Sequence, residues 1–338
     1  MDLLVVGDCN PDVLVLGGDV TPEFGQQEKL VDSISLVIGG SAAITAVAAA
    51  RLGLRVVLAA AVGDDPAGEF MLGQLTKEGV DVSAVVIRDG APTGMTVALS
   101  RGRDRAILTA LGTVASLTAA DIPAALLARS RHVHASSFFL LEGSLGPGLP
   151  GILAAARAAG AATSLDTNWD PSGRWGSERL TAAIAQADVL LPNEAEALRL
   201  SGAASLDAAV RILTAAGVPA AGVPAARRTG QRLVVKLGER GALCAEDAGW
   251  HRVSLPSVVP ADSTGAGDCF NAGLIAGLLG GRTLPGAAAL GCAAGALSTG
   301  VPGGTGSAPD LAHAAGLAQL ATIARVRPPS PAESSHPR

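Results

Sequence analysis

The chain has 338 residues, of which 49% are hydrophobic and 2% aromatic, and its 25 Lys and Arg against 30 Asp and Glu give a net charge of −5. This length allows one large α/β domain or two unequal domains, either of which can bury a substantial core. The acidic balance, without a basic run interleaved with aromatic residues, excludes the electrostatic footprint of a nucleic-acid-binding protein and favours a small-molecule partner.

The amino terminus and the most apolar stretch argue against a membrane protein. Residues 1–10 have an acidic second residue and only a short apolar run, unlike a signal peptide. Residues 42–62 are rich in alanine and carry two arginines, which does not suit a membrane span.

Four cysteines without a CxxC pair argue against a disulfide framework or a structural zinc site. We therefore expect a soluble cytoplasmic protein that contacts neither membranes nor nucleic acids.

Short β-branched runs alternate along the chain with alanine-rich segments of helical length. The predicted core strands are residues 3–7, 55–63, 132–136, 162–166, 188–193 and 232–238. The predicted helices are residues 41–52, 68–78, 151–159, 193–200 and 207–216. Continuous apolar strands connected by helices are typical of a mostly parallel sheet covered on both faces. The sequence thus predicts a doubly wound α/β fold.

Two regions interrupt this alternation with strands that no helix separates. Residues 12–18 and 28–40 flank a Pro/Gly-containing connection, and residues 94–112 read as two strands joined by a polar turn. Together these insertions, at about 12–38 and 94–112, predict a small β-sheet that projects from the core. Such a sheet would act as a lid over a site at the carboxyl ends of the core strands, and a homodimer could form through it.

The remaining segments predict one domain over residues 1–325. A short AAGVPA duplication within residues 214–231 is interpreted as a loop rather than a domain boundary. The Pro/Ser-rich tail, residues 326–338, is expected to be disordered.

A glycine turn with an acidic residue precedes the apolar segment of DSTGAGDCFNAG, residues 262–273. Gly265, Ala266 and Gly267 allow a tight turn whose N–H groups, with the dipole of the following helix, attract anions such as phosphate. Asp268 could accept a proton from an alcohol while those amides stabilise a transferring phosphoryl group. Taken alone, the same residues also fit a plain helix start with a favourable acid. The stretch matches neither the GxxxxGK[ST] nor the GxGxxG pattern.

Several stretches resemble, in order, segments of the ribokinase-like, or PfkB, carbohydrate kinases. The family's carboxyl-terminal signature is similar to DSTGAGDCFNAG, and its amino-terminal signature is similar to GGSAAITAVAAARLG at residues 39–53. Further matches are GDCNPDVLV, VGDDPAGEFMLGQLTKEGVD, SLDTNWDPSGRW, LLPNEAEALRLSG and VVKLGERGALC, and the resemblance covers about residues 3–312. Several motifs that occur in the family's order are far more specific for the family than any single motif.

The resemblance implies ATP-dependent phosphorylation of a hydroxyl group on a sugar or sugar-like molecule. Asp268 would be the general base, and the amides of Gly265, Ala266 and Gly267 would form the anion hole.

The resemblance also implies sites for ATP and Mg²⁺. Asn193 and Glu196 match the family's NxxE element, which organises Mg²⁺ and its waters near the phosphates, and on a helix their side chains share a face. Alone, Asn193 also fits a helix cap. The stretch KLGERG resembles a nucleotide-binding turn, although a plain β-turn would need the same glycines. Its candidate nucleotide-binding residues are Lys236, Gly238, Glu239 and Gly241.

Asp262 and Thr264 match positions near a monovalent cation in many relatives. The resemblance therefore implies activation by K⁺, whereas a local hydrogen-bonded cap is the alternative interpretation.

The residues implied to contact the phosphoryl acceptor come from several segments. A carboxylate that accepts hydrogen bonds from vicinal hydroxyls suits a polyol, and paired glycines allow close backbone approach to a ligand. The implied acceptor contacts are Asp12, Gly39, Gly40, Ser41, Ile44, Asp166 and Asn168.

Ile44 departs from the family pattern, because many members have asparagine there. An apolar side chain leaves a hydroxyl group without its expected partner. We therefore expect an acceptor other than ribose, or ribose held differently.

Two other functions stay open. A nucleoside kinase on the same scaffold is disfavoured by the low aromatic content, since few rings can stack on a base. A non-catalytic sugar-binding relative is disfavoured because Asp268, the glycine turn and the NxxE pair are all present.

Overall fold

A computed structural model gives the fold. It describes residues 1–101, 104–214, 231–258, 260, 262–307 and 310–326. Most of the predicted loop at 214–231 and nearly all of the predicted tail at 326–338 lie outside these described residues.

The larger sheet of the described chain has ten strands in the order β14-β13-β12-β11-β10-β9-β8-β1-β4-β5. These strands are β1 (Leu3–Val6), β4 (Val56–Gly63), β5 (Asp81–Arg88), β8 (His132–Ala135), β9 (Ala162–Leu165), β10 (Val189–Leu190), β11 (Arg232–Lys236), β12 (Ala242–Glu246), β13 (Gly249–Ser254) and β14 (Thr322–Val326). Neighbours from β5 to β11 pair in parallel, and β11 to β14 pair antiparallel. The predicted, mostly parallel sheet is confirmed.

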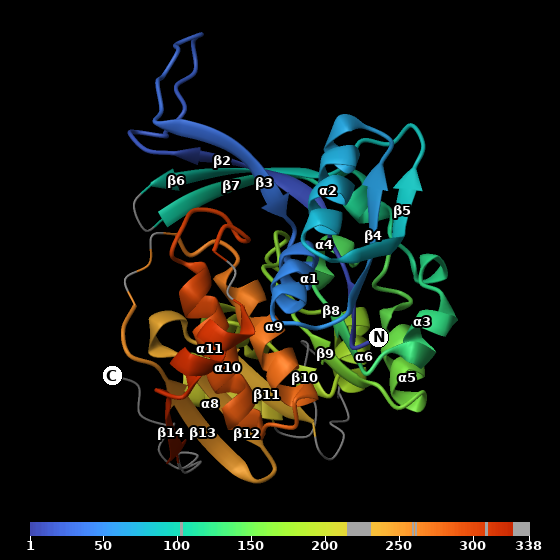
Figure 1. The fold of residues 1–338 in the computed structure, drawn as a ribbon, viewed down its shortest axis with the longest axis vertical. Helices are drawn as coiled ribbons and strands as arrows, with labels where there is room; N and C mark the ends of the chain where they lie inside the picture. The colour runs from blue at the N-terminus through green and yellow to red at the C-terminus, as the bar shows by residue number, and fades with distance from the viewer. Residues whose placement is uncertain (102–103, 215–230, 259, 261, 308–309, 327–338) are drawn as a thin grey trace.

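Helices cover both faces of this sheet (Figure 1). Their bounds are α1 (Ser41–Arg51), α2 (Pro66–Lys77), α3 (Ala124–Arg129), α4 (Phe138–Leu141), α5 (Leu149–Ala158), α6 (Glu178–Gln186), α7 (Glu194–Ser201), α8 (Leu206–Thr214), α9 (Ala266–Leu279), α10 (Leu284–Ser298) and α11 (Leu311–Ala318). Leu3 and Val5 of β1 belong to a core cluster with residues of α1, α2 and α9 to α11, whereas Leu4 and Val6 belong to one with residues of α3 to α8. This alternation is the expected result of strand pleating, and it gives the predicted doubly wound core.

The second helix begins two residues before the predicted start at residue 68. Asp65 is its N-cap and accepts a hydrogen bond from the backbone N–H of Gly68 at 2.9 Å, and Pro66 occupies the first helical position. Proline is favoured there because that position donates no helical hydrogen bond. Among the described residues, no helix is long and apolar enough to cross a membrane.

A separate sheet of four described strands has the order β3-β2-β6-β7. Its strands are β2 (Asn10–Leu16), β3 (Ser33–Gly39), β6 (Met95–Arg101) and β7 (Asp104–Ala110). The parallel pairing of β2 with β6 joins two segments that are far apart in the sequence. In Figure 1 this sheet runs across the upper part of the molecule, above the carboxyl-terminal helices. The expected second, smaller sheet is therefore present.

Candidate active site

The glycine turn stands at the amino end of α9. Gly265 is the N-cap, with φ 71° and ψ 0°. An added Cβ atom there would lie 2.5 Å from the Cα atom of Gly304, so both the left-handed backbone and the close contact require glycine. Ala266, Gly267 and Asp268 form the first helical turn. Backbone N–H groups at such a turn, together with the helix dipole, favour a bound anion.

Asp268 is the acidic residue of this turn, and it is buried. Burial raises the pKa of Asp268 well above its ordinary value, and the carboxylate of Asp166 adds to this increase. Lys236 and a hydrogen bond from Ser41 act on the pKa in the opposite direction. A carboxylate with a raised pKa is a stronger proton acceptor, so Asp268 suits the predicted role of a base beside the glycine turn.

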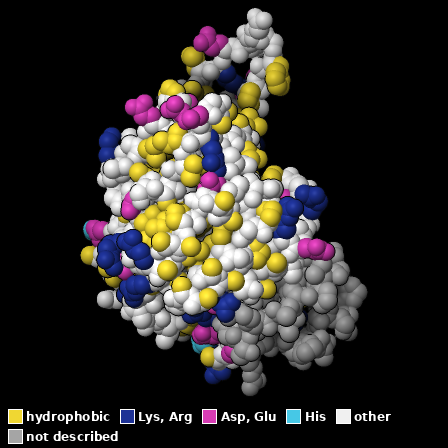
Figure 2. Space-filling view, turned by 90° about the vertical axis from the view of Figure 1, so that its right-hand side faces the viewer, with side chains coloured by type: hydrophobic (Ala, Val, Ile, Leu, Met, Phe, Trp, Pro, Cys, Tyr) yellow, Lys and Arg dark blue, Asp and Glu magenta, His cyan; other side chains and the backbone are white. Residues whose placement is uncertain are grey.

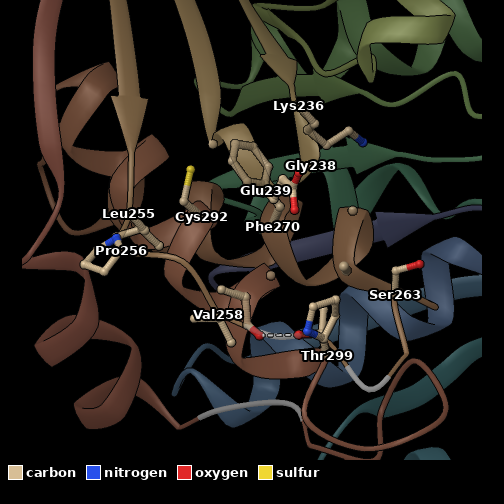
Figure 3. A pocket seen from close by; sticks show the side chains of 16 residues that line it. Lys236, Gly238, Glu239, Leu255, Pro256, Val258, Ser263, Phe270, Cys292 and Thr299 are labelled. Carbon is tan, nitrogen blue, oxygen red and sulfur yellow. Dashed lines mark hydrogen bonds between the residues drawn. The ribbon is translucent and has the colours of Figure 1, made fainter. Parts of the chain in front are cut away.

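A cavity of about 200 Å³ opens beside this turn. Much of its wall is apolar, including Leu255, Val258 and Phe270 (Figure 3). The predicted nucleotide-binding residues Lys236, Gly238, Glu239 and Gly241 line this cavity. Two residues of the glycine turn, Ala266 and Gly267, line it as well. An apolar pocket with polar groups at one side can hold the base and the phosphates of a nucleotide.

Asp166 and Lys236 form a buried ion pair. Lys236 Nζ donates to Asp166 Oδ2 at 2.5 Å, and Asn271 Nδ2 donates to the same oxygen at 2.6 Å. Asp166 was predicted to contact the acceptor, but it is fully buried and its Oδ2 atom binds these protein groups. A direct contact between Asp166 and the acceptor therefore stays a prediction.

The predicted metal pair lies at the amino end of α7 and forms a capping box. Asn193 Oδ1 accepts from the backbone N–H of Glu196 at 2.9 Å, and Glu196 Oε2 accepts from the backbone N–H of Asn193 at 2.8 Å. Asn193 is therefore a helix cap, as the alternative interpretation of its sequence position predicted. Burial, with the charge of Asp166, raises the pKa of Glu196 to about 7. Within the described part of the chain, no cluster of three or more His, Cys, Asp or Glu could hold a metal ion, so the Mg²⁺ role stays a prediction.

Asp12 lies on β2, where the smaller sheet meets the core. Asn10 Nδ2 donates to Asp12 Oδ1 at 3.1 Å. A Cβ atom on Gly39 would stand 1.9 Å from the same oxygen, so glycine makes room for this carboxylate. Burial and the nearby Asp8 raise the pKa of Asp12 to about 7. Asp8 itself accepts from the backbone N–H of Ser41 at 3.0 Å, at the start of α1.

Ser41 and Asn168 are brought together by a hydrogen bond. Asn168 Nδ2 donates to Ser41 Oγ at 2.8 Å, and Asn168 Oδ1 accepts from the backbone N–H of Ser137 at 2.8 Å. Because Ser41 lowers the pKa of Asp268 through its side chain, these two predicted acceptor contacts adjoin the predicted base. Their direct contact with an acceptor stays a prediction.

Ile44 packs against the glycine turn. An added Cβ atom on Gly304 would lie 2.5 Å from Ile44 Cδ1, and one on Gly265 would lie 3.1 Å from Ile44 Cγ2. The side chain is buried, and it supports the backbone from which α9 begins. Ile44 therefore has a packing role in addition to its predicted influence on the choice of acceptor.

The predicted cation residues form a local hydrogen-bonded loop. Asp262 Oδ1 accepts from the backbone N–H of Thr264 at 2.9 Å, and Asp262 Oδ2 accepts from that of Gly303 at 2.9 Å. Arg105 of β7 donates to Thr264 Oγ1 at 2.7 Å, which ties the smaller sheet to the glycine turn. Asp262 and Thr264 therefore form the local hydrogen-bonded cap that was their alternative interpretation. K⁺ binding stays a prediction.

Three neighbours of the predicted site residues were missed from the sequence. Asp8 follows β1 and Asn271 stands three residues after Asp268 on α9, so strand-end position and helical spacing were usable signals. Arg105 had no such signal, because only the pairing of β7 in the smaller sheet brings it to Thr264.

Comparison with known proteins identifies the family. The pfkB family carbohydrate kinase model matches residues 2–311. A ribokinase from Haemophilus influenzae is 26% identical over 311 residues, covering 91% of this chain and 95% of the relative. A fructokinase from Klebsiella pneumoniae is 31% identical over 298 residues, covering 85% and 86%. The chain belongs to the pfkB carbohydrate kinase family and is a kinase, as the sequence motifs predicted.

Solved structures support the fold. Arabidopsis thaliana ribokinase complexed with ribose and ATP matches with a TM-score of 0.73 at 21% identity, covering 94% of this chain and 98% of that chain. At this identity the likeness concerns the fold.

Proposed function

We propose that this kinase transfers the terminal phosphoryl group of ATP to a hydroxyl group of a sugar or sugar-like molecule. The observation that carries the proposal is the start of α9, where Asp268 and the glycine turn lie together beside the apolar cavity. Phosphoryl transfer requires from a protein mainly alignment of the reactants and stabilisation of charge. One helix start supplies both here.

In this proposal Asp268 takes the proton of the acceptor hydroxyl as the new phosphate ester bond forms. The amides of Gly265, Ala266 and Gly267 stabilise the negative charge on the phosphoryl oxygens. A positioned base of this kind contributes about 10²- to 10⁴-fold to a rate. The raised pKa of Asp268 makes its carboxylate a stronger proton acceptor, in keeping with this role.

ATP is proposed to occupy the cavity that Lys236, Gly238, Glu239 and Gly241 line. Glu196 fits a role near Mg²⁺, because only its Oε2 atom is engaged in the capping box and carboxylate oxygens are preferred ligands of this ion. Asn193 and Glu196 would hold the hydrated ion, which when bound neutralises phosphate charge.

The acceptor is proposed to lie between Asp268 and the smaller sheet, with Asp12 accepting hydrogen bonds from its hydroxyls. We propose that this sheet acts as the lid of a single domain spanning residues 1–325. The hydrogen bond from Arg105 to Thr264 supports the proposal, because it joins the sheet to the anion-binding turn. A closed lid excludes water, which would otherwise compete with the acceptor.

The face of the lid turned away from Asp12 supports pairing with a second copy of the chain. Strand register places Leu36, Val13, Val97 and Leu108 in one row, and residues in the next row, including Asp12, point to the opposite face. Leu36 and Leu108 are 44% and 65% exposed. This uncharged apolar row is complementary to itself, as a two-fold contact requires.

Light scattering of Leu108→Glu tests the dimer. We expect a wild-type dimer and a monomeric variant, because a charge would enter the apolar contact. Leu320→Glu is the matched control, since Leu320 is 62% exposed and lies outside this sheet. A monomeric wild type, or a dimer that tolerates Leu108→Glu, would contradict the pairing.

The proposed function is tested by ADP release over a panel of sugars, sugar-like polyols and nucleosides with Mg²⁺ and ATP. We expect turnover with a sugar or polyol. Turnover confined to nucleosides would replace the proposal by the nucleoside kinase alternative. If no alcohol is phosphorylated while a sugar still raises the melting temperature, the chain is a non-catalytic sugar-binding protein instead.

A further inference from the structure

The ammonium group of Lys236 lies beside the anion-binding turn. Lys236 ends β11 and lines the cavity proposed for ATP. Its Nζ atom is 3.6 Å from the position that a Cβ atom would take on Gly267, in the first turn of α9. The side chain is 11% exposed, so its charge is largely removed from water. A charge in such a place interacts strongly with a phosphoryl group at the turn.

Asp166 and Asn271 hold this ammonium in a closed ring of hydrogen bonds. Lys236 Nζ donates to Asp166 Oδ2 at 2.5 Å and lies 3.4 Å from Asn271 Oδ1, while Asn271 Nδ2 donates to Asp166 Oδ2 at 2.6 Å. The three residues come from the end of β11, the end of β9 and α9. Because a lysine side chain is flexible, this ring is what fixes the charge in space.

The groups facing Lys236 are mostly acidic. Asp166, Glu196 and Asp268 are carboxylates, and His134 of β8 also faces it. Burial lowers the pKa of Lys236, but the carboxylates more than offset this effect, so the side chain is a cation. Burial lowers the pKa of His134 to about 4, which leaves that ring neutral near neutral pH. Lys236 is thus the cation of a cluster that would otherwise repel phosphate.

We infer that Lys236 is a catalytic residue that contacts the transferring phosphoryl group, and that Asp166 and Asn271 are positioning residues that hold its ammonium beside Gly267. The inference rests on the proposed function, since it takes the terminal phosphate of ATP to bind at the glycine turn. A charge already fixed at the phosphoryl oxygens needs no reorganisation during transfer.

Calorimetric titration with Mg²⁺ and ATP, ADP or AMP, without an acceptor, tests the inference. In Lys236→Met we expect the affinity for ATP to fall about 10-fold while affinities for ADP and AMP change less than about twofold, because only ATP carries the terminal phosphate. Lys77→Met, at an exposed lysine on α2, is the matched control and should bind all three as the wild type does. An equal loss for all three nucleotides, or no loss, would overturn the role of Lys236.

Lys236→Met leaves the Asp166 carboxylate buried without its cation, which can prevent folding. The double variant Lys236→Met/Asp166→Asn removes both charges and should fold, as circular dichroism would show, with the same selective loss of ATP affinity. Should the folded double variant retain the wild-type preference for ATP, the inference fails.

The difference between ATP and ADP affinity also tests the positioning role of Asp166. Asp166→Asn keeps the size of the side chain but removes the charge that holds the ammonium of Lys236. Its ATP affinity should therefore fall while its affinities for ADP and AMP change less than about twofold. An equal loss for all three nucleotides, or no loss, would contradict the positioning role. Since no acceptor is present, these results stand apart from the acceptor panel.

Discussion

On the proposed transfer side of the site, one continuous segment, residues 262–273, supplies the glycine turn, the proposed base Asp268 and Asn271. The proposed acceptor side is assembled differently, since its polar groups come from the end of β1, from β2, from the start of α1 and from the segment after β9. Figure 2 shows Lys, Arg, Asp and Glu side chains spread over the visible face, with several Lys and Arg side chains gathered at its left edge. In the proposed function, chemistry and selectivity are thus carried by separate parts of the chain.

This division predicts that changes on the transfer side lower kcat for every acceptor, whereas changes on the acceptor side alter KM and preference. The largest effect is expected for Asp268→Asn, which removes the proton acceptor but keeps the size of the side chain. Its kcat should fall by about 10²-fold or more while ATP affinity is retained. Steady-state kinetics with calorimetry would check this, and a kcat within about twofold of the wild type would remove Asp268 from the mechanism.

Gly265→Ala should have the next largest effect. The new Cβ atom would meet Gly304 at 2.5 Å, and φ is 71°, so the turn must move from the position in which it would hold a phosphoryl group. We expect kcat to fall about 10-fold for all acceptors. Gly281→Ala is the control, since Gly281 has φ 80° but nothing within 4 Å of an added Cβ atom. Equal losses in the two variants would mean that backbone strain alone, and not the turn's geometry, limits turnover.

Asp12→Asn should act on the acceptor side. Because the pKa of Asp12 is about 7, its carboxylate ionises as the pH rises through neutrality, and it then accepts hydrogen bonds from hydroxyls. The wild-type KM for the acceptor should therefore fall as the pH rises from about 6 to about 8, and Asp12→Asn should raise KM several-fold and abolish this dependence. A pH dependence that survives the substitution would assign it to another group.

Asp12→Asn should also change the stability of the fold. At about pH 8 it should weaken acceptor binding but make the folded protein more stable. The pKa of Asp12 is 3.8 in the unfolded chain and about 7 in the folded chain. Between these two pH values Asp12 is protonated in the folded chain but ionised in the unfolded chain, so stability declines as the pH rises through this window. Asp12→Asn should thus raise the melting temperature at about pH 8 and change it little at about pH 4, as calorimetry would show.

Ile44→Asn should have the smallest effect on turnover, and it can break the comparison. We expect the order of preference among acceptors to change, because asparagine gives an acceptor hydroxyl a polar partner at position 44. Because Ile44 also packs against Gly265 and Gly304, kcat should fall about fivefold or less, and a buried unpaired amide should cost about 1–3 kcal/mol of stability. An unchanged order of preference would show instead that position 44 acts through packing alone.

The sequence predicted the fold well, and it placed the glycine turn at a helix start, because the signals for both are local. Strand and helix periodicity gave the layers, and the glycine turn was legible as a helix start. The acceptor side was harder, since contacts such as Asn168 with Ser41 join residues 127 positions apart. Asn193 illustrates a second limit, because one spacing fits both a capping box and a metal site. Asp166 shows a third, since its position near the site was expected but its bond to Lys236 was not.

The central claim is that the start of α9 directs phosphoryl transfer to an alcohol rather than to water. ADP release alone does not separate these reactions, whereas phosphorus NMR of the mixture with Mg²⁺, ATP and the preferred acceptor does. The account predicts a phosphate monoester of the acceptor formed in step with ADP. Inorganic phosphate formed in step with ADP, with no ester, would contradict it.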